Sequence, residues 1–338
     1  MRTAVVILNW NTREHLQRWL PGLVASVEGT DAAVTVADNA STDGSVQYVR
    51  ENFPQVGLLE FDTNYGFTGG YNRALASIDA EYYVLVNSDI DAPAGWLEPL
   101  VAWMDENADC AVCGPKIHAM DGAFGRTGRF EYAGAAGGWL DRYCYPFCRG
   151  RVLGRTEQDN GQYDVPADVQ WISGACMMVR SSVWKALGGL DERFFAHMEE
   201  IDFCSRAIRA GHRVSVVPQS TVWHLGGGTL PQDSPFKLKL NYRNSILMME
   251  KMMPARRVFV RKLLDGASAA IYLVTGRPAC FKAVWDAHRE ARKMHEEGSA
   301  VFVPGPMDRI RIIPLALLKG EKVFKYLRNY EDNNCRCR

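Results

Sequence analysis

Short apolar runs alternate with amphipathic stretches through the first hundred residues. The runs have the length of buried strands, and the stretches between them carry apolar positions at helical spacing. The pattern predicts strands at 3–8, 34–37, 57–61 and 82–86, and helices at 13–27, 44–51, 70–78 and 94–106. Strands that alternate with helices predict an α/β fold with a Rossmann-like mixed, mainly parallel sheet flanked by helices. Ligands of such sheets bind beyond the carboxyl ends of the strands, so we look for chemistry in the loops after strands one, two and four.

The remainder of the chain changes character twice. Residues 116–170 are rich in glycine and aromatic side chains and show no period, so we expect a long irregular excursion across the ligand-binding face. Regular structure returns with a predicted strand at 175–179 and helices at 182–187 and 199–210. From 236 onward the spacing is helical, which predicts a helical C-terminal extension interrupted at Pro254, Pro278, Pro304 and Pro314.

The net charge of zero conceals two parts of opposite sign. Residues 1–236 carry 18 Lys and Arg against 29 Asp and Glu, whereas residues 237–338 carry 21 against 10. The basic third also holds amphipathic stretches near 256–274 and 309–328, a combination typical of a segment that lies on an anionic membrane surface. A solvated basic face, or one that docks on the acidic domain, explains the charge equally well. No nucleic acid is expected as a partner, because no motif that reads nucleic acid accompanies the charge.

Neither the apolar runs nor the cysteines indicate a membrane-spanning or secreted protein. No run reaches the roughly 18 apolar residues of a spanning helix. The N-terminus opens into a strand without the regions of a signal peptide, so we expect a cytoplasmic location. The nine cysteines are odd in number, which argues against a disulfide framework. Cys110 and Cys113 form a CxxC inside a strand-like run, and we expect core thiols there in preference to zinc ligands.

Polar side chains gather just after the fourth predicted strand. Asn87, Asp89 and Asp91 alternate along an extended stretch. Carboxylates at such a position suit a hard divalent cation, which prefers oxygen ligands and also binds substrate phosphates. The other interpretation is a helix N-cap, since Asp91 precedes the helix predicted at 94–106. The two are compatible, because Asp89 can bind a metal while Asp91 caps the helix.

The loop after the second strand carries Asp38, where Rossmann-like folds place an acid that contacts the nucleoside. Nicotinamide binding is disfavoured, because the loop after the first strand reads Asn9-Trp10-Asn11 and lacks the G-x-G-x-x-G pattern. The chain has no Walker A sequence either, which argues against a P-loop kinase or ATPase.

Three further groups of polar residues have two interpretations each. Glu199, Glu200 and Asp202 open a predicted helix, where acids are favoured by the helix dipole alone but can also provide a general base for an acceptor hydroxyl. His224 follows a strand and precedes three glycines, so it is either a metal ligand or a core residue. Arg243 offers a guanidinium to a diphosphate, or takes part in a surface ion pair.

Over residues 3–245 the chain resembles the family 2 inverting glycosyltransferases with a GT-A fold, and within them the bacterial rhamnosyltransferase-like group that builds surface polysaccharides. Each motif is weak alone, but the ordered set is specific. The segments that carry the resemblance are VVILNWN (5–11), VADNASTDGS (36–45), NYGFTGGYNRA (64–74), VNSDID (86–91), WISGACMMVR (171–180), GGLDERFF (188–195), EEID (199–202), WHLGGG (223–228) and NYRN (241–244).

The resemblance implies transfer of a sugar from a nucleoside diphosphate sugar, dTDP-rhamnose-like or a UDP-sugar, to a glycan acceptor hydroxyl with inversion. It implies a GT-A catalytic domain at 1–235, with a nucleotide-binding half at 1–115 and an acceptor-binding half at 116–235, followed by the basic helical extension at 236–338. It also implies Mg²⁺ or Mn²⁺ as cofactor and a role in cell-surface polysaccharide synthesis. Acceptors in this group are usually lipid-linked, so we expect peripheral contact with the inner face of the plasma membrane.

Site residues follow from the matching positions. Glu200 stands where the family's base stands and is the candidate base, with Glu199 or Asp202 able to share the role. Residues expected at the nucleotide sugar are Asn9, Trp10, Asn11, Asp38, Asn64, Asn72, Asn87 and Arg243. Residues expected at the acceptor are Trp171, Ser173 and Gly174, and the expected metal ligands are Asp89, His224 and Asp91.

Two positions depart from the family pattern. The acidic pair is Glu199-Glu200 where the family usually has Glu-Asp, and Asn87 replaces the first acid of a DxD motif. The first departure leaves open a catalytically silent glycan-binding or scaffold subunit. A sugar nucleotidyltransferase on a similar fold is the other alternative, and release of pyrophosphate would distinguish it.

Overall fold

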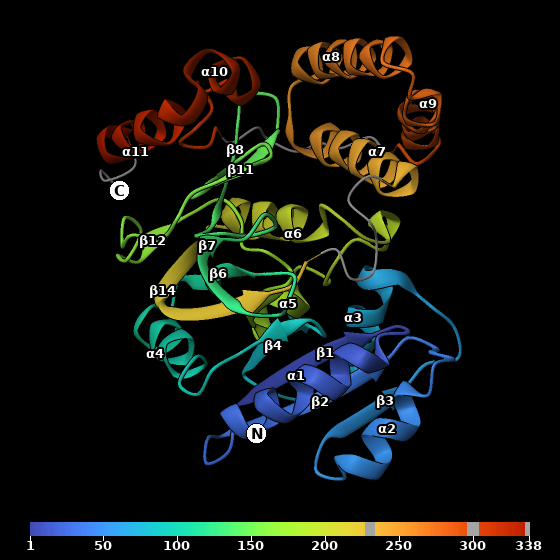
Figure 1. The fold of residues 1–338 in the computed structure, drawn as a ribbon, viewed down its shortest axis with the longest axis vertical. Coiled ribbons are helices and arrows are strands. Elements are labelled where there is room, and N and C mark those ends of the chain that lie inside the picture. Colours follow the sequence, from blue (N-terminus) through green and yellow to red (C-terminus); the bar gives the residue numbers. More distant parts are fainter. Residues whose placement is uncertain (227–233, 296–303, 335–338) are drawn as a thin grey trace.

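A computed structural model describes residues 1–226, 234–295 and 304–334 (Figure 1). Its centre is a ten-stranded sheet with the order β12-β14-β6-β13-β4-β1-β2-β3, to which β5 and β7 add at β14 and β6. Helices α1, α2 and α4 pack on one face, and α3, α5 and α6 pack on the other. The expected α/β class, with helices on both faces and a helical C-terminal region, is confirmed.

The N-terminal half follows the predicted alternation closely. Strand β1 pairs in parallel with β2 and β4, and β2 pairs in parallel with β3. The elements are β1 Thr3–Asn9, α1 Arg13–Ser26, β2 Ala32–Asp38, α2 Ser45–Asn52, β3 Gly57–Glu60, α3 Gly66–Ala76, β4 Tyr82–Asn87, β5 Ile90–Asp91 and α4 Glu98–Glu106.

Two helix starts differ from the prediction. Helix α3 begins at Gly66, four residues early, because the Asn64 side chain accepts a hydrogen bond from the Gly66 N–H and the carbonyl of the distant Phe195 accepts from Phe67 and Thr68. Helix α4 begins at Glu98, later than expected, after a turn that follows β5. Asp91 lies in β5 and does not cap that helix, so the capping interpretation of Asp91 was wrong.

The segment expected to be irregular holds several strands instead. The beginning of this segment, which covers residues 116–170, lies in β6 Cys110–Met120 and β7 Arg126–Phe130. A separate four-stranded sheet follows, made of β8 Gly138–Leu140, β9 Pro146–Cys148, β10 Arg151–Val152 and β11 Arg155–Thr156. Strands of two or three residues show no readable period, which explains why the sequence pattern missed them.

The central sheet is mixed because the second half of the chain reverses direction. Strands β12 Ala167–Asp168 and β13 Cys176–Arg180 run antiparallel to their neighbours, whereas the long β14 Arg213–His224 runs parallel to β6. Between them come α5 Ser181–Ala186, the short η1 Glu192–Phe194 and α6 Glu199–Arg209.

The extension is helical as expected. It contains α7 Pro235–Met252, α8 Ala255–Val274, α9 Pro278–Lys293, α10 Ile312–Lys319, η2 Gly320–Lys322 and α11 Val323–Asn334. Pro254 immediately precedes α8 and Pro278 opens α9, where a proline is tolerated because the first N–H groups of a helix have no partner. Pro314 lies inside the first turn of α10 and does not end it.

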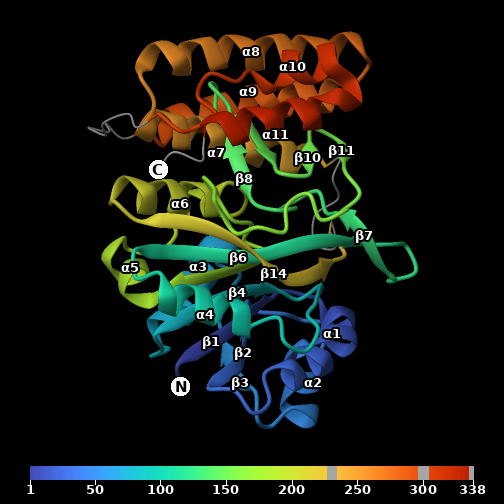
Figure 2. The same cartoon turned by 90° about the vertical axis from the view of Figure 1, so that its left-hand side faces the viewer.

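The extension and the catalytic part share one hydrophobic core. Ile246, Met248 and Met249 of α7 are fully buried and belong to the same packed cluster as Phe203 and Ala207 of α6. Figure 2 shows the extension stacked over α6, at the end of the molecule opposite β1–β3. The boundary at 235 stays a prediction, but the packing is continuous across it.

Cysteines and apolar helices agree with the sequence expectations within the described residues. The seven cysteines described are free and buried, and Cys110 and Cys113 lie inside β6. In the same part of the chain, no helix is both long enough and apolar enough to cross a bilayer.

Candidate active site

Three strand ends bring the predicted donor residues to one edge of the sheet. Strand β1 lies between β2 and β4, and Asn9 is paired with Asp38 while Leu8 is paired with Asn87. Because the three strands are parallel, their carboxyl ends meet there. The loops after strands one, two and four therefore converge as expected.

Asp38 and Asn9 hold the first two of these loops together. Both are buried, and the Asn9 amide donates to the Asp38 carboxylate at 2.7 Å and to the Ser41 hydroxyl at 3.0 Å. The other Asp38 oxygen accepts from the Ser41 N–H at 2.7 Å. Asn11 accepts from the Thr42 N–H at 2.7 Å. These contacts give Asp38 and Asn11 a loop-fixing role, and their contact with the donor's base stays a prediction.

Trp10 differs from its neighbours because its side chain is 42% exposed. It lies in the chain between Asn9 and Asn11, whose side chains fix the loops, and its ring is open to a ligand. Aromatic faces stack on planar bases. Trp10 is therefore the residue of this group best suited to contact a nucleobase.

Asn64 and Asn72 are engaged within the fold. The Asn64 side chain accepts from the Gly66 N–H and from the Asn39 amide. Asn72 donates to the Leu190 carbonyl at 2.8 Å and accepts from the Leu190 N–H at 2.9 Å. Their predicted contact with the sugar nucleotide stays untested, and the contacts described position α3 and the loop before η1.

A second cluster joins the end of β4 to the end of β14. His224 Nε2 lies 3.1 Å from Asp89 Oδ1 and 3.5 Å from the Asn87 amide nitrogen, while His224 Nδ1 faces Glu131 Oε1 at 3.6 Å. Asp89, Glu131 and His224 are all buried. The sequence analysis predicted Asp89 and His224 as metal ligands. It did not identify Glu131, which lies in the segment expected to be irregular.

The geometry of this pair fits a divalent cation. Two adjacent ligands about 2.1 Å from an octahedral Mg²⁺ lie about 3 Å apart, which matches the separation of the Asp89 oxygen and the His224 nitrogen. Glu131 stands where a carboxylate orients a metal-binding histidine through its other nitrogen. Within residues 1–226, 234–295 and 304–334, no three His, Cys, Asp or Glu side chains are already arranged around a common point.

The carboxylates around His224 favour a positive charge between them. Burial alone would lower the pKa of His224, but the carboxylates of Asp89 and Glu131 outweigh burial and raise that pKa well above its ordinary value. Burial would raise the pKa of Asp89, and His224 instead lowers it. A metal ion that used His224 as a ligand would have to displace its proton.

Asp91 is engaged elsewhere. Its two oxygens accept from the Arg126 guanidinium at 2.6 and 2.9 Å, and that guanidinium lies over the Trp223 ring. The predicted metal contact of Asp91 stays untested, and the structure gives it an ion pair between β5 and β7.

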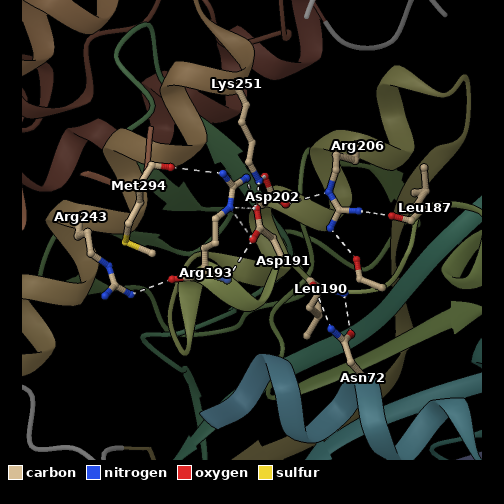
Figure 3. Close-up of polar contacts among 11 residues, drawn as sticks. Asn72, Leu187, Leu190, Asp191, Arg193, Asp202, Arg206, Arg243, Lys251 and Met294 are labelled. Carbon is tan, nitrogen blue, oxygen red and sulfur yellow. Dashed lines mark hydrogen bonds and ion pairs between the residues drawn. The ribbon is translucent and has the colours of Figure 1, made fainter. Parts of the chain in front are cut away.

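The structure separates the three acids at the start of α6. Asp202 is fully buried and paired, accepting from Arg206 and from Lys251 at 2.8 Å each (Figure 3). Glu199 and Glu200 differ, because the Oε2 atom of each is buried without a hydrogen-bond partner. Buried polar atoms are almost always satisfied, so two adjacent exceptions indicate a place for a ligand. Asp202 has the contacts of a structural residue.

Glu200 also has a pKa suited to a base. Burial raises it from 4.5 to about 7. Burial, and after it the neighbouring Glu200 carboxylate, also raise the pKa of Glu199 well above its ordinary value. A β-carbon placed on Gly174 would lie 3.6 Å from the β-carbon of Glu200, so the predicted acceptor residue Gly174 does adjoin it.

The other two predicted acceptor residues lie deeper. Trp171 is 2% exposed, donates to the Trp139 carbonyl at 3.2 Å and packs on Gly138. Ser173 is buried and accepts from the Ala175 N–H at 3.3 Å. Both therefore support the wall behind Gly174, and their contact with an acceptor stays a prediction.

The loop that delivers the acidic pair has an unusual backbone. Phe195, His197 and Met198 have φ values of 63°, 71° and 72°, in the left-handed region that side chains disfavour. Such a path persists only where its surroundings hold it. The holding contacts come from outside the loop, from the Phe67 and Thr68 N–H groups of α3, which donate to the Phe195 carbonyl, and from α7.

Asn244 and Arg243 provide the contacts from α7, which we call the α7 clamp. The buried Asn244 amide lies 3.0, 2.8 and 2.7 Å from the carbonyl oxygens of Phe194, Ala196 and His197. Arg243 donates to the carbonyls of Arg193 and Phe194 at 3.2 and 2.8 Å (Figure 3). Arg243 is only 9% exposed, and its guanidinium is engaged by the loop carbonyls. Its predicted contact with a diphosphate stays a prediction.

Sequence reasoning missed two titratable side chains, one next to the acidic pair and one beside Glu131. His197 Nε2 is buried without a partner, and burial lowers the pKa of His197 to about 4. Lys237, on the first turn of α7, is half-buried, and burial lowers its pKa although Glu131 opposes the change. Sequence spacing could not find them, because neither lies in a recognisable motif.

The Glycosyl transferase family 2 model matches residues 4–186, more than half of the chain. The chain belongs to this family. The match covers the donor loops, Asp89 and Gly174, and it ends before the acidic pair and His224. The match thus confirms the family that the ordered motifs indicated, and the protein is a family 2 glycosyltransferase.

Curated relatives agree with this assignment. The chain is 26% identical over 256 residues to the N-acetylglucosaminyl-diphospho-decaprenol L-rhamnosyltransferase of Mycobacterium tuberculosis, covering 72% of this chain and 83% of the relative. It is 22% identical over 246 residues to the dTDP-rhamnosyl transferase RfbF of Shigella flexneri, covering 69% and 75%. These similarities confirm the resemblance to the rhamnosyltransferase-like group.

Among solved structures, the mannosyltransferase PcManGT from Pyrobaculum calidifontis, in complex with GDP-Man and Mn²⁺, has a similar fold. Its TM-score is 0.52 at 14% identity, over 97% of this chain and 84% of that chain. At this identity the likeness concerns the fold alone, and it confirms the GT-A architecture of the family 2 glycosyltransferase.

Proposed function

We propose that this glycosyltransferase moves one sugar from a nucleoside diphosphate sugar to a hydroxyl of a glycan acceptor, with inversion, in cell-surface polysaccharide synthesis. The donor is proposed to be dTDP-rhamnose or a related nucleotide sugar, since two relatives are named as rhamnosyl transferases. The observation that carries the proposal is the pair of buried, unpartnered carboxylate oxygens of Glu199 and Glu200 beside Gly174.

The reaction needs one base and one displacement. The acceptor oxygen forms a bond to the anomeric carbon of the sugar while the bond from that carbon to the diphosphate oxygen breaks. The bonding electron pair leaves with the nucleoside diphosphate, and the proton of the acceptor hydroxyl passes to the Glu200 carboxylate. A single attack from the opposite face inverts the anomeric configuration.

Asp89 and His224 would hold a divalent cation, Mg²⁺ or Mn²⁺. Such an ion, when bound, stabilises the negative charge of a diphosphate leaving group as a Lewis acid. Glu131 would orient His224, and Asn87 would lie at the edge of the same site. Trp10 would stack on the base of the donor.

The acceptor is proposed to be lipid-linked, as the name of the mycobacterial relative states for its own substrate. A lipid-linked acceptor is confined to a bilayer, so the enzyme must work at its surface. The surplus of basic residues in 237–338 supports contact with an anionic membrane, at the inner face of the plasma membrane.

A screen of dTDP-, UDP- and GDP-sugars tests the proposal. A donor present at about 100 times its Kd should add roughly 2.7 kcal/mol to the free energy of unfolding. The stabilising donor is then incubated with Mn²⁺ and a lipid-linked glycan, and the products are identified. Nucleoside diphosphate and a glycan with inverted linkage are expected. Release of pyrophosphate, or no turnover with a donor that binds, would overturn the proposal and favour the nucleotidyltransferase or the silent subunit.

A further inference from the structure

Helix α8 buries a row of charged residues against the protein and exposes large apolar residues, the reverse of an ordinary surface helix. Its charged residues Arg257, Arg261 and Asp265, spaced four apart, face the protein and are 7%, 4% and 0% exposed. Arg261 pairs with Asp265 at 2.8 Å and donates to the Tyr143 carbonyl, and Arg257 pairs with Asp308. These three charged side chains of α8 are thus engaged in contacts within the protein.

The opposite face of α8 is apolar and open. Its large side chains have between 39% and 88% of their surface exposed, although a soluble protein normally turns such residues inward. They are Phe259, Leu263, Leu264, Ile271, Leu273 and Val274. Ala267 and Ala270 are also exposed and fill the stripe between them. The apolar surface therefore runs along nearly the whole helix.

Large apolar side chains are exposed on neighbouring helices too. On α10, Leu317 and Leu318 are 76% and 85% exposed, and on α9 Trp285 is 67% exposed. Figures 1 and 2 both place α8 and α10 at the same end of the molecule, the end farthest from β1–β3. We call the exposed apolar residues of α8 and α10 the outer face. Exposed apolar surface of this extent marks an interaction site.

Charge complementarity identifies the occupant. The described residues of 237–338 build this end, and in the sequence that segment carries 21 basic against 10 acidic residues. Arg256, Lys262, Arg277 and Lys319 are exposed beside the apolar stripe of α8 or at the end of α10. An apolar stripe with basic residues along its border is how a helix lies in the headgroup region of an anionic bilayer. A second copy of the chain would place two basic faces against each other.

We propose that the outer face inserts into the headgroup and upper acyl region of an anionic lipid bilayer, with α8 lying in the plane of the membrane. This deepens the proposed function, on which it rests, because a lipid-linked acceptor would then reach the enzyme from the surface that the enzyme is bound to. The buried pairs of Arg257 and Arg261 hold α8 in the orientation that exposes its apolar residues. No residue of the proposed active site belongs to the outer face.

The test uses the full chain and flotation with vesicles of phosphatidylcholine, with or without phosphatidylglycerol. The wild type should float with the anionic vesicles at low salt and less so at high salt. The double variant Leu263→Ser, Ile271→Ser should weaken binding by at least about tenfold, because both side chains lose their apolar transfer energy. The two side chains are 58% and 62% exposed, so the double variant should fold like the wild type and have the same Tm in thermal unfolding.

The matched control is Val165→Ser, which removes a side chain that is 74% exposed and outside the outer face. It should bind like the wild type. Equal binding of wild type and double variant would overturn the proposal, as would equal binding to neutral vesicles at all salt concentrations. Failure of wild-type binding together with a wild-type dimer that the double variant loses, measured by light scattering, would identify a second copy as the occupant instead.

Donor hydrolysis without acceptor separates this inference from the proposed function. The double variant should release nucleoside diphosphate at the wild-type rate, since the outer face lies away from the donor loops. Vesicle binding without any donor turnover would leave the membrane face standing and overturn the proposed function. Donor turnover without vesicle binding would do the reverse.

Discussion

At the scale of single residues, contacts rather than identity separate the acids of the site. Glu199, Glu200 and Asp202 read alike in the sequence, but only Asp202 is neutralised by Lys251 and Arg206. Lys251 lies 49 residues away and on another element, so no sequence spacing could reveal the pairing. The sequence did predict Asp89 and His224 as neighbours, because their motif positions resemble those of the family.

Glu200→Gln is the direct test of the base. The amide keeps the size of the side chain but cannot accept the proton, so kcat should fall by about 10²–10⁴-fold while the Kd of the donor changes little. Glu199→Gln should reduce kcat less, and Glu200→Asp should keep partial activity. If Glu199→Gln is the more damaging change, Glu199 is the base. If neither change affects kcat, this acidic pair takes no part in catalysis.

The pH profile should show the same group. Burial raises the pKa of Glu200 to about 7, and the base acts only when it is deprotonated. Activity should therefore be low in acid, rise through about pH 7 and level off above it, and kcat/KM measured across this range should report the free enzyme. This rise of activity through about pH 7, the acid limb of the profile, should be absent from the residual activity of Glu200→Gln. A limb that stays unchanged in that variant would belong to another group.

Asp89→Ala should abolish Mn²⁺-dependent turnover. Loss of outer-shell partners alone weakens metal binding by about 10–100-fold, so loss of a ligand should cost at least about 100-fold in Mn²⁺ affinity, measured by calorimetry. His224→Ala should have a smaller effect, because oxygen ligands remain. Asp91→Asn is the control, since Asp91 is paired with Arg126, and it should keep the metal dependence. Normal Mn²⁺ binding by Asp89→Ala would show that the metal site lies elsewhere.

At the scale of elements, β1, β2 and β4 were predictable because buried parallel strands are apolar throughout, and the edge strand β3 was recognised by its short apolar run. Helix α3 was predicted late because its first residues, Gly66 to Gly70, resemble a turn. Its start depends on Asn64 and on the carbonyl of Phe195, more than a hundred residues away. The small sheet β8–β11 depends on tertiary pairing of very short strands, which leaves no periodic signal.

The α7 clamp yields a prediction at this scale. Asn244→Ala removes the amide that faces three loop carbonyls, and unsatisfied buried carbonyls cost about 1–3 kcal/mol of folding free energy. Misplacement of the acidic pair should lower kcat by up to about 10²-fold, with little change in the KM of the donor, and should shift the acid limb of the pH profile.

Asn52→Ala is the control for this variant, because its amide donates to a single exposed carbonyl, that of Tyr48. It should leave kcat and the pH profile unchanged. If Asn244→Ala unfolds at a lower temperature but keeps both kcat and the position of the limb, the clamp stabilises the fold without positioning the base.

At the scale of the whole molecule, one core runs from the sheet into the extension. Helix α7 packs on α6 and clamps the loop before it, while α8 and α10 turn apolar residues outward at the far end. The charge asymmetry of the sequence left a membrane surface, a solvated basic face and docking on the acidic domain open, and it did not indicate which side of each helix is exposed. That choice depends on the buried pairs of Arg257 and Arg261, which only the folded chain shows.

The α7 clamp has a consequence for how this protein can diverge over generations. Asn244 and Arg243 bind the loop through carbonyl oxygens, which every amino acid possesses, and touch none of its side chains in the contacts described. Substitutions at Phe195, Ala196 and His197 can therefore accumulate without losing the clamp, as long as the left-handed path is kept. We expect acceptor preference to drift among descendants through this loop, while the asparagine and arginine that hold it stay the same.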